Sequence, residues 1–459
     1  MKKLLYISAF AFLIFVIPSC NKKLDVKPQN NATPDQIKTS DDVTALLFGA
    51  YAQLQNYGGF GEQYILVSDL IASAEQVKWV GSYVQYRDIQ NKRMTATNYI
   101  MASLWGNSYK TLNIVNTVLD KINLVDSSIR PTVQAEAKFI RATVYYEMLG
   151  VFAKPYSDGK AATNPGVPLV LAPIYTYDPA TNNPSRATVQ QVYTQIIADL
   201  VAAIVDLPET NDDFRADRYS AKAFLSRAYL NTQDYTNAAI QANDVIESGN
   251  FRLTNTYAQA FNNTTNSSED IFAIQQTAQS NPGTSNDGLI TFYAPYGGKQ
   301  KGRGDAQIDP DYFNYFETTD DRGNFVTQSF SIGSTPGYYP NKWSTFYKAL
   351  SVVRLSEMYL TRGEANLFNN THLGAEPADD INIIRGRSNA SPLAAGSLTA
   401  QDFVDERFRE LGFEGDRMWT LKRLKMDVDG FGYDDDALIL PLPQSEIDVN
   451  HNLKQNTGY

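Results

Sequence analysis

The sequence predicts a mostly α-helical fold, in which tetratricopeptide-like helix pairs form a scaffold and a loop-rich region with short strands packs on it. Two observations favour the scaffold. Several segments place apolar residues three to four positions apart, and residues 219–253 have the alanine pattern of two closely packed helices. A third observation favours the loop-rich region: residues 281–343 hold nine of the 28 glycines and twelve aromatic residues, with little helical period.

The chain begins with a predicted export signal. Two lysines precede fourteen mostly apolar residues at positions 4–17, a run that is short for a membrane span and typical of a signal peptide. Cys20, the only cysteine of the 459 residues, follows the tripeptide "IPS" in the outline of a lipoprotein signal. We predict a signal peptide at residues 1–19, lipidation of Cys20 and a flexible tether at residues 20–35. The alternative is an ordinary secretory signal with an incidental cysteine.

The first predicted helices follow the tether. Apolar stripes in residues 105–122 and 133–148 predict an antiparallel helix pair. Residues 188–206 predict a third helix, which Thr188 and Gln191 begin as a capping box.

The second half contains two further predicted pairs. The alanine-rich segment 219–253 should form two helices that break near residues 231–234, with Gly249 as the final stop. Residues 350–388 should form another pair with a longer connection. Residues 56–98 and 281–343 lack a helical period, so we expect irregular ligand-binding loops there.

The composition limits the classes of function. The chain carries a net charge of −10 at pH 7, which disfavours nucleic acids and anionic membrane surfaces as partners. Hydrophobic residues make up 43% of the chain, enough for a large core. We expect one domain over residues 36–459.

Carboxylates gather in "ERFRELGFEGDRMWTLKR", and paired carboxylates are what glycoside hydrolysis uses. Arginines are interleaved with them, and nearby cations keep carboxylates ionised, which disfavours a general acid. Structural ion pairs are therefore expected, and the same interpretation applies to Arg354 with Glu357 and to Arg362 with Glu364. The carboxylates are Glu406, Glu410, Glu414 and Asp416.

No metal or cofactor site is predicted. The two histidines, His372 and His451, have no ligand neighbours at useful spacing. The acidic run 426–436 does not match the helix–loop–helix calcium pattern, so we expect a solvated turn there and leave a bound calcium ion open. The basic, glycine-rich run 297–304 lacks the helix and hydroxyl residue of a phosphate loop.

A family resemblance covers the chain from the lipid signal to the last residue. It rests on stretches in family order that include "CNKKLDVKPQN", "LWGNSYKTLNIVNTVLDKI", "AEAKFIRATVYYEMLGVFAKPY", "RYSAKAFLSRAYLNTQDYTNAAIQANDVIESGNFRL", "VVRLSEMYLTRGEANL", "ERFRELGFEGDRMWTLKR" and "LILPLPQSEIDVNHNLKQNTGY". The sequence resembles the SusD/RagB family of outer-membrane nutrient-binding lipoproteins. The resemblance implies four tetratricopeptide-like pairs with an irregular half, and a role in capturing a nutrient for a SusC-like TonB-dependent transporter. It aligns no ligand-binding residue.

Aromatic residues in the irregular segments are the candidate ligand contacts, because sugars pack C–H faces on rings and bind polar side chains through their hydroxyls. About half of such rings should be packing residues. We favour Trp79, Tyr83, Tyr296 and Trp343 most. The predicted site is Trp79, Tyr83, Tyr86, Tyr293, Tyr296 and Trp343.

The sequence thus predicts a non-enzymatic, lipid-anchored protein, and the family resemblance implies that it sits in the outer membrane and faces the cell exterior. It would bind an oligosaccharide and pass it to the transporter. A peptide or another nutrient as ligand is an alternative, and a surface glycosidase that uses residues 406–416 is a second.

Overall fold

The computed structural model describes residues 36–212, 214–296, 302–330 and 336–459. The chain divides into two units, residues 1–38 and 39–459, and the second is described below. The predicted signal peptide, Cys20 and the predicted tether lie outside the described residues. A single domain over residues 36–459 stays a prediction. Of the helices described, none is both long and apolar enough to cross a membrane.

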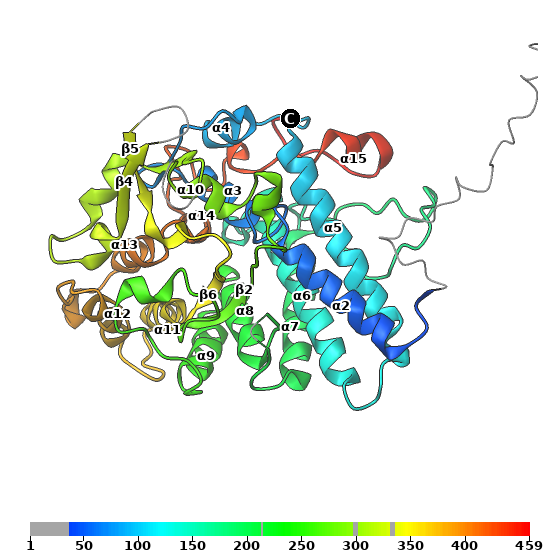
Figure 1. Ribbon diagram of the computed structural model, residues 1–459, viewed down its shortest axis with the longest axis horizontal. Coiled ribbons are helices and arrows are strands. Elements are labelled where there is room, and N and C mark those ends of the chain that lie inside the picture. Colours follow the sequence, from blue (N-terminus) through cyan, green and yellow to red (C-terminus); the bar gives the residue numbers. More distant parts are fainter. Residues whose placement is uncertain (1–35, 213, 297–301, 331–335) are drawn as a thin grey trace, which may run out of the picture. The chain divides into compact units, whose positions relative to one another are not determined.

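Helices dominate the described residues, which confirms the mostly α-helical prediction, and Figure 1 shows their arrangement. The helices are α2 (Ser40–Gln55), α3 (Gln63–Ile71), α4 (Val84–Gln90), α5 (Tyr99–Asp120), α6 (Arg130–Phe152), α7 (Val189–Asp206), α8 (Arg218–Asn231), α9 (Tyr235–Ile246), α10 (Leu289–Tyr293), α11 (Leu355–Asn369), α12 (Pro377–Arg387), α13 (Ala400–Leu411), α14 (Asp416–Arg423) and α15 (Gln444–Val449).

The longer helices pack in a row that runs from right to left across the lower half of Figure 1. Each of α5 to α8 packs on the next helix, and α11 packs on both α9 and α12. Packing between sequence neighbours is the principle of repeat scaffolds. The three predicted pairs are confirmed as α5 with α6, α8 with α9, and α11 with α12.

Two local predictions about these helices are confirmed. Thr188 Oγ1 accepts a hydrogen bond from the Gln191 amide at 3.2 Å, and Gln191 Oε1 accepts one from the Thr188 amide at 2.9 Å, so α7 begins with a capping box. The small side chains between α8 and α9 allow close helix approach, because each is almost completely buried. They are Ala223, Ala228, Ala238, Ala239 and Ala242.

Two segments differ from the prediction. Residues 56–98 contain α3 and α4, and every residue of α3 is buried. A helix buried on all sides has no polar face and hence no amphipathic period, so the sequence pattern gave no sign of it. Residues 350–354, predicted as the start of a helix, instead form the fully buried strand β6.

The strands form three two-stranded antiparallel sheets, β1 with β3, β2 with β6, and β4 with β5. They confirm short strands in the loop-rich region, because β3, β4 and β5 all lie within residues 281–343. The strands are β1 (Val77–Trp79), β2 (Asp270–Ile274), β3 (Ala306–Ile308), β4 (Val326–Phe330), β5 (Pro336–Pro340) and β6 (Leu350–Arg354).

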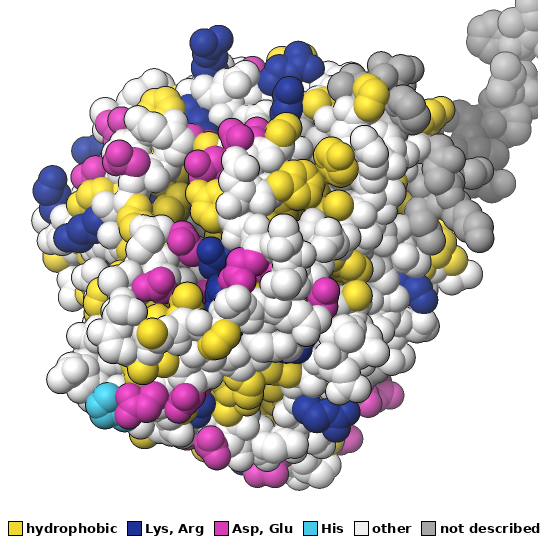
Figure 2. All heavy atoms as spheres, turned by 90° about the vertical axis from the view of Figure 1, so that its left-hand side faces the viewer, with side chains coloured by type: hydrophobic (Ala, Val, Ile, Leu, Met, Phe, Trp, Pro, Cys, Tyr) yellow, Lys and Arg dark blue, Asp and Glu magenta, His cyan; other side chains and the backbone are white. Residues whose placement is uncertain are grey.

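Figure 2 shows the face on the left-hand side of Figure 1, where β4, β5, α12 and α13 lie. Hydrophobic side chains gather in its upper half, between acidic and basic groups. The upper end of the molecule is also where α4 and α10 lie in Figure 1. Hydrophobic and charged side chains therefore lie side by side in the upper half of this face.

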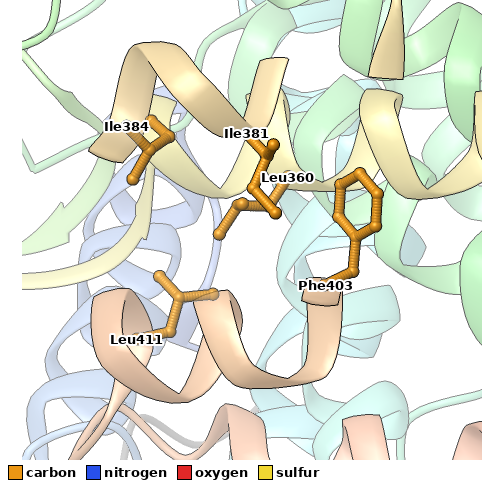
Figure 3. Packing of buried hydrophobic residues seen from close by; sticks show 5 residues of the cluster. All are labelled: Leu360, Ile381, Ile384, Phe403 and Leu411. Carbon is orange, nitrogen blue, oxygen red and sulfur yellow. The ribbon is translucent and has the colours of Figure 1, made fainter. Parts of the chain in front are cut away.

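The core between α11, α12 and α13 is purely aliphatic and aromatic, and its side chains point toward one another in Figure 3. Each of its five residues is at most 3% exposed, so the three helices are held by apolar burial. The residues are Leu360, Ile381, Ile384, Phe403 and Leu411.

Candidate functional site

The β1–β3 ladder brings the two predicted loop regions together. It pairs Trp79 with Ala306 and Val77 with Ile308, so a segment of residues 56–98 lies against a segment of residues 281–343. A Cβ atom on Gly81 would lie 2.5 Å from Asp305 Cγ, so only glycine allows this approach. The ladder places α4 and α10 at the same end of the molecule (Figure 1).

A buried layer of three aromatic rings supports this end. The Trp79 ring centroid lies 4.8 Å from that of Tyr86 and 5.4 Å from that of Phe292. Trp79 Nε1 donates to the Tyr83 carbonyl at 3.1 Å, which fixes the start of α4. Such ring clusters are rigid because each ring restricts its neighbours.

Tyr83 lies above that layer and is partly exposed. Its ring meets Phe292 edge to face at 5.9 Å, and the Arg303 guanidinium lies 4.9 Å from its centroid. Arg303 Nε donates to Asp305 Oδ2 at 2.7 Å, so the cation is held in place. Asn286 Nδ2 lies 3.4 Å from the Tyr83 hydroxyl.

Tyr99 completes the exposed surface at the start of α5. Asn98 accepts from the Ile100 amide and donates to the Gln85 carbonyl, which holds this helix end beside α4. Partial burial raises the pKa of Tyr99 to about 12, and the nearby Tyr83 and Asp287 add to the rise. Tyr99 is 44% exposed.

We call Tyr83, Tyr99, Asn286, Asp287 and Arg303 the platform. Partial burial raises the pKa of Asp287, and the charge of Arg303 opposes that rise, so the two groups act on each other. The platform thus presents two rings beside an amide, a carboxylate and a guanidinium. This combination suits a ligand that has both apolar faces and hydroxyl groups.

The structure separates the predicted site residues by exposure. Trp79, Tyr86, Tyr293 and Trp343 are at most 4% exposed and belong to the interior. Tyr293 donates to Asp69 Oδ2 at 2.8 Å, and Trp343 Nε1 donates to the Phe413 carbonyl at 2.7 Å. Tyr83 is partly exposed and Tyr296 is 48% exposed, so these two offer rings to a ligand. A binding role for all six stays a prediction.

Of the five platform residues, only Tyr83 belongs to the predicted site; Tyr99, Asn286, Asp287 and Arg303 lie outside it. Tyr99 directly follows the predicted loop region 56–98, so extending that region by one residue would have included it. Arg303 was considered only as part of a basic, glycine-rich run, and its position over Tyr83 depends on the β1–β3 ladder.

Comparisons with known proteins give the family. A family model described as "Starch-binding associating with outer membrane" matches residues 22–230, and one described as "SusD family" matches residues 325–438. The chain is 25% identical to the SusD-like protein P2 of Formosa agariphila, with all of both chains covered. The chain belongs to the SusD/RagB family.

Solved structures show the same fold. A SusD superfamily protein from Bacteroides thetaiotaomicron matches with a TM-score of 0.83 and 24% identity, over 91% of this chain and 99% of the other. Surface glycan-binding protein A of that organism, in complex with laminarihexaose, matches with a TM-score of 0.74 and 19% identity, over 91% and 99% of the two chains. At these identities the likeness concerns the SusD fold alone.

The carboxylates of residues 406–416 in this SusD-family protein form ion pairs, as predicted. Glu410 Oε1 accepts from Arg387 at 2.6 Å and from Arg354 at 3.0 Å, and all three residues are at most 5% exposed in their side chains. Burial alone would raise the pKa of Glu410, but Arg387, Arg354 and Arg322 together outweigh it and hold the pKa well below its usual range. This carboxylate stays ionised and is unsuited to donate a proton.

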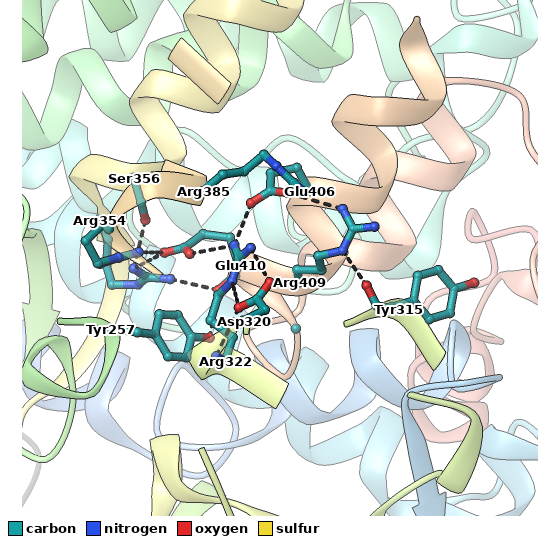
Figure 4. A network of polar contacts seen from close by, with 12 residues as sticks. Tyr257, Tyr315, Asp320, Arg322, Arg354, Ser356, Arg385, Glu406, Arg409 and Glu410 are labelled. Atoms are coloured by element: carbon teal, nitrogen blue, oxygen red, sulfur yellow. Dashed lines mark hydrogen bonds and ion pairs between the residues drawn. The ribbon is translucent and has the colours of Figure 1, made fainter. Parts of the chain in front are cut away.

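The ion pairs join the loop-rich region to the scaffold (Figure 4). Arg322 of the loop-rich region donates to Glu406 at 2.6 Å, and Arg385 of α12 donates to the same carboxylate at 2.8 Å. Lys342 binds Glu414 at 2.6 Å and the Gly412 carbonyl at 2.7 Å. We call the group around Glu406, Glu410 and Glu414 the charged network.

The predicted local pairs are wrong in their partners. Arg354 binds Glu269, Glu410 and Glu414, whereas Glu357 binds Arg227. Arg354 is the last residue of β6 and Glu357 lies in α11, so the two do not share a helix face. Arg362 binds Asp380, and Glu364 binds Arg423, because residues two apart point to different sides of a helix.

The acidic run 426–436 is not simply a solvated turn. Asp429 accepts from the Ser73 amide and the Ala74 amide at 2.9 Å each and pairs with Lys92. It therefore ties the turn to the segment that precedes β1. Among the described residues, no group of three or more carboxylate, histidine or cysteine side chains is arranged to hold a metal ion.

Proposed function

We propose that this SusD-family protein is a non-enzymatic binding protein that captures an oligosaccharide at the platform. The observation that carries the proposal is the platform itself, where partly exposed tyrosine rings lie beside the side chains of Asn286, Asp287 and Arg303. Pyranose rings offer C–H faces to aromatic rings and hydroxyls to polar side chains. Surface glycan-binding protein A, which shares the fold, was solved with a glucose-based hexasaccharide bound.

The binding role is supported over hydrolysis by the state of the carboxylates. Glycoside hydrolysis needs one carboxyl group that holds its proton near neutral pH. In residues 406–416, ion pairs with arginine and lysine keep the pKa values of Glu410, Glu414 and Asp416 below their ordinary range despite burial. These groups stabilise the fold instead.

The substitution Tyr83→Ala tests the binding site. We expect it to weaken oligosaccharide binding about tenfold, on the order of 1.4 kcal/mol, because it removes one ring face and the support of Arg303. Isothermal titration against a panel of glycans that includes laminarihexaose, with peptides as a second panel, gives the measurement.

The matched control is Tyr175→Ala. Tyr175 is 40% exposed and its hydroxyl binds Asp120 at the far end of α5, about 33 Å from Tyr99 along a 22-residue helix. The Tyr175→Ala variant should bind the oligosaccharide with the affinity of the wild type. Binding to peptides alone, or equal losses in both variants, would contradict the proposed site.

We also propose that the protein is anchored in the outer membrane through lipidated Cys20, faces the cell exterior and delivers its ligand to a SusC-like TonB-dependent transporter. The lipoprotein signal and the family membership support this. In mild detergent, wild-type protein from the membrane fraction should bring down a large β-barrel, whereas Cys20→Ala protein should leave the membrane fraction. Recovery of the wild type without a barrel would count against the delivery role.

A further inference from the structure

A buried carboxyl group lies beneath the platform and binds both of the chain segments that carry Tyr83 and Asp287. Glu62, which precedes α3, has no exposed surface. Its Oε1 accepts from the hydroxyl of Tyr86 in α4, and its Oε2 accepts from the Gly288 amide at 2.5 Å. Tyr86 belongs to the segment that carries Tyr83, whereas Gly288 directly follows Asp287.

The backbone around Gly288 is shaped for this contact. Gly288 has a φ of +106°, a conformation that side chains rarely allow, and a Cβ atom there would lie 3.1 Å from Pro282 Cγ. The next amide, that of Leu289, donates to the Gly61 carbonyl at 2.8 Å. Two consecutive N–H groups at the start of α10 thus bind the segment Gly61–Glu62.

We infer that Glu62 is a positioning residue for the platform: it fixes α4 and the start of α10 relative to each other and so sets ligand affinity without touching the ligand. The predicted effect of Glu62 on ligand affinity rests on the proposed function. Its predicted effect on the protection of the Gly288 amide does not. Truncating Glu62 would leave the Tyr86 hydroxyl and the Gly288 amide buried without their acceptor.

The protonation state of Glu62 adds a signature that a purely steric role would not give. Burial raises the pKa of Glu62 to about 8, although the bonds from Tyr86 and Gly288 lower it, and Asp287 raises it further. The ionisable groups that act on it are Tyr86 of α4, Tyr99 of α5 and Asp287 before α10. An opening that exposes Glu62 to water would let it ionise near pH 4.5, so such opening becomes easier as pH rises from about 4.5 to about 8.

Hydrogen exchange at the Gly288 amide measures this opening directly. In the wild type, the protection factor of Gly288 should fall about tenfold between pH 6 and pH 7 and about fivefold between pH 7 and pH 8. Glu62→Gln cannot ionise; it keeps the shape and one oxygen that can accept from the Gly288 amide, and its NH₂ group can donate to the Tyr86 hydroxyl as the protonated carboxyl would. In this variant protection at pH 6 should be retained and should not change with pH. In Glu62→Ala, protection at pH 7 and oligosaccharide affinity should each fall at least tenfold.

The matched control is Glu147→Ala. Glu147 is another buried glutamate whose pKa burial raises to about 8, but it lies in α6 and contacts no part of the platform. In Glu147→Ala, the protection factor of the Gly288 amide and the oligosaccharide affinity should both stay within twofold of the wild type. Wild-type protection in Glu62→Ala, or a pH slope in Glu62→Gln equal to that of the wild type, would overturn the inference.

The two proposals fail in different ways. If the wild type binds no glycan, the proposed function is wrong, and the exchange of Gly288 still decides the role of Glu62. If the wild type binds glycan and Gly288 does not respond to Glu62→Gln or Glu62→Ala, the function stands and the inference is wrong. Should Glu62→Ala not fold, the pH profile of Glu62→Gln decides.

Discussion

The substitution Glu410→Gln should lower the free energy of unfolding by about 3–5 kcal/mol, because it leaves buried arginines without their counter-charge. Glu410 accepts from Arg354, Arg387 and Arg322, and the side chains of Glu410, Arg354 and Arg322 have no exposed surface. Glutamine keeps the shape of the side chain, so the loss reports charge rather than a cavity. Urea denaturation followed by circular dichroism at pH 7 gives the measurement.

The control for Glu410→Gln is an exposed ion pair. Glu209 binds Arg218 at 3.0 Å with 65% of its side chain exposed, and Glu209→Gln should cost no more than about 1 kcal/mol. Equal losses in the two variants would mean that the charged network contributes nothing beyond a surface pair.

The charged network should also make the protein acid-sensitive. The pKa of Glu410 is lower in the folded protein than its ordinary value of 4.5, so its contribution to stability is present above pH 4.5 and is lost as pH falls below it. The difference in stability between wild type and Glu410→Gln should therefore shrink on acidification.

The substitution Glu147→Gln should have the opposite pH dependence. Glu147 is 6% exposed, and its carboxyl has no hydrogen-bond partner in the described part of the chain. It lines a cavity with a water-accessible volume of about 40 Å³, room for about three waters at 10–15 Å³ each. Burial raises the pKa of Glu147 to about 8, which Arg227 opposes and Glu357 reinforces.

A raised folded-state pKa means that stability is lost as pH increases. The neutral Glu147 carboxyl is retained in the fold, whereas the unfolded chain ionises near pH 4.5, so stability should decline between pH 4.5 and about 8. Each pH unit costs about 1.4 kcal/mol. The free energy of unfolding of Glu147→Gln minus that of the wild type should thus grow by about 4 kcal/mol from pH 5 to pH 8.5.

Denaturant titrations of both proteins at those two pH values give the comparison. Glu209→Gln is again the control, since an exposed carboxylate should show no such trend. A difference between Glu147→Gln and the wild type that stays constant with pH would show that Glu147 is already ionised in the fold at pH 5.

The scaffold was predictable because its helices carry local sequence patterns; this includes α6, although residues 139–152 are buried on all sides. The stripe in residues 188–206, the cap at Thr188 and the alanines of residues 219–253 each leave a local signature in the sequence. The helix α3 has no such signature, since it is only nine residues long and all nine are buried. The ion-pair partners of Arg354 could not be predicted from local sequence either, because residues 269, 410 and 414 are distant from it in the chain.

The platform could be located only roughly. The sequence indicates that residues 56–98 and 281–343 lack a helical period and that the second segment is rich in aromatic side chains, but which rings face solvent depends on long-range packing. Trp79 and Tyr83 are four residues apart, and the first is buried beneath Phe292 while the second lies under Arg303. The three-residue ladder between β1 and β3 determines which ring is buried, and the sequence of neither strand indicates that it pairs with the other.

That ladder has a practical consequence for redesigning the specificity of the protein. The segment that carries Tyr83 and the segment that carries Arg303 are separated by about 220 positions in the chain, yet each supplies part of the platform. Transplanting only one of these two segments from a relative would combine a foreign segment with a native one in the platform. A graft that carries residues 77–99 together with residues 286–308 transfers the β1–β3 ladder and the platform rings together. It also transfers Tyr86 and Gly288, the two hydrogen-bond donors to Glu62.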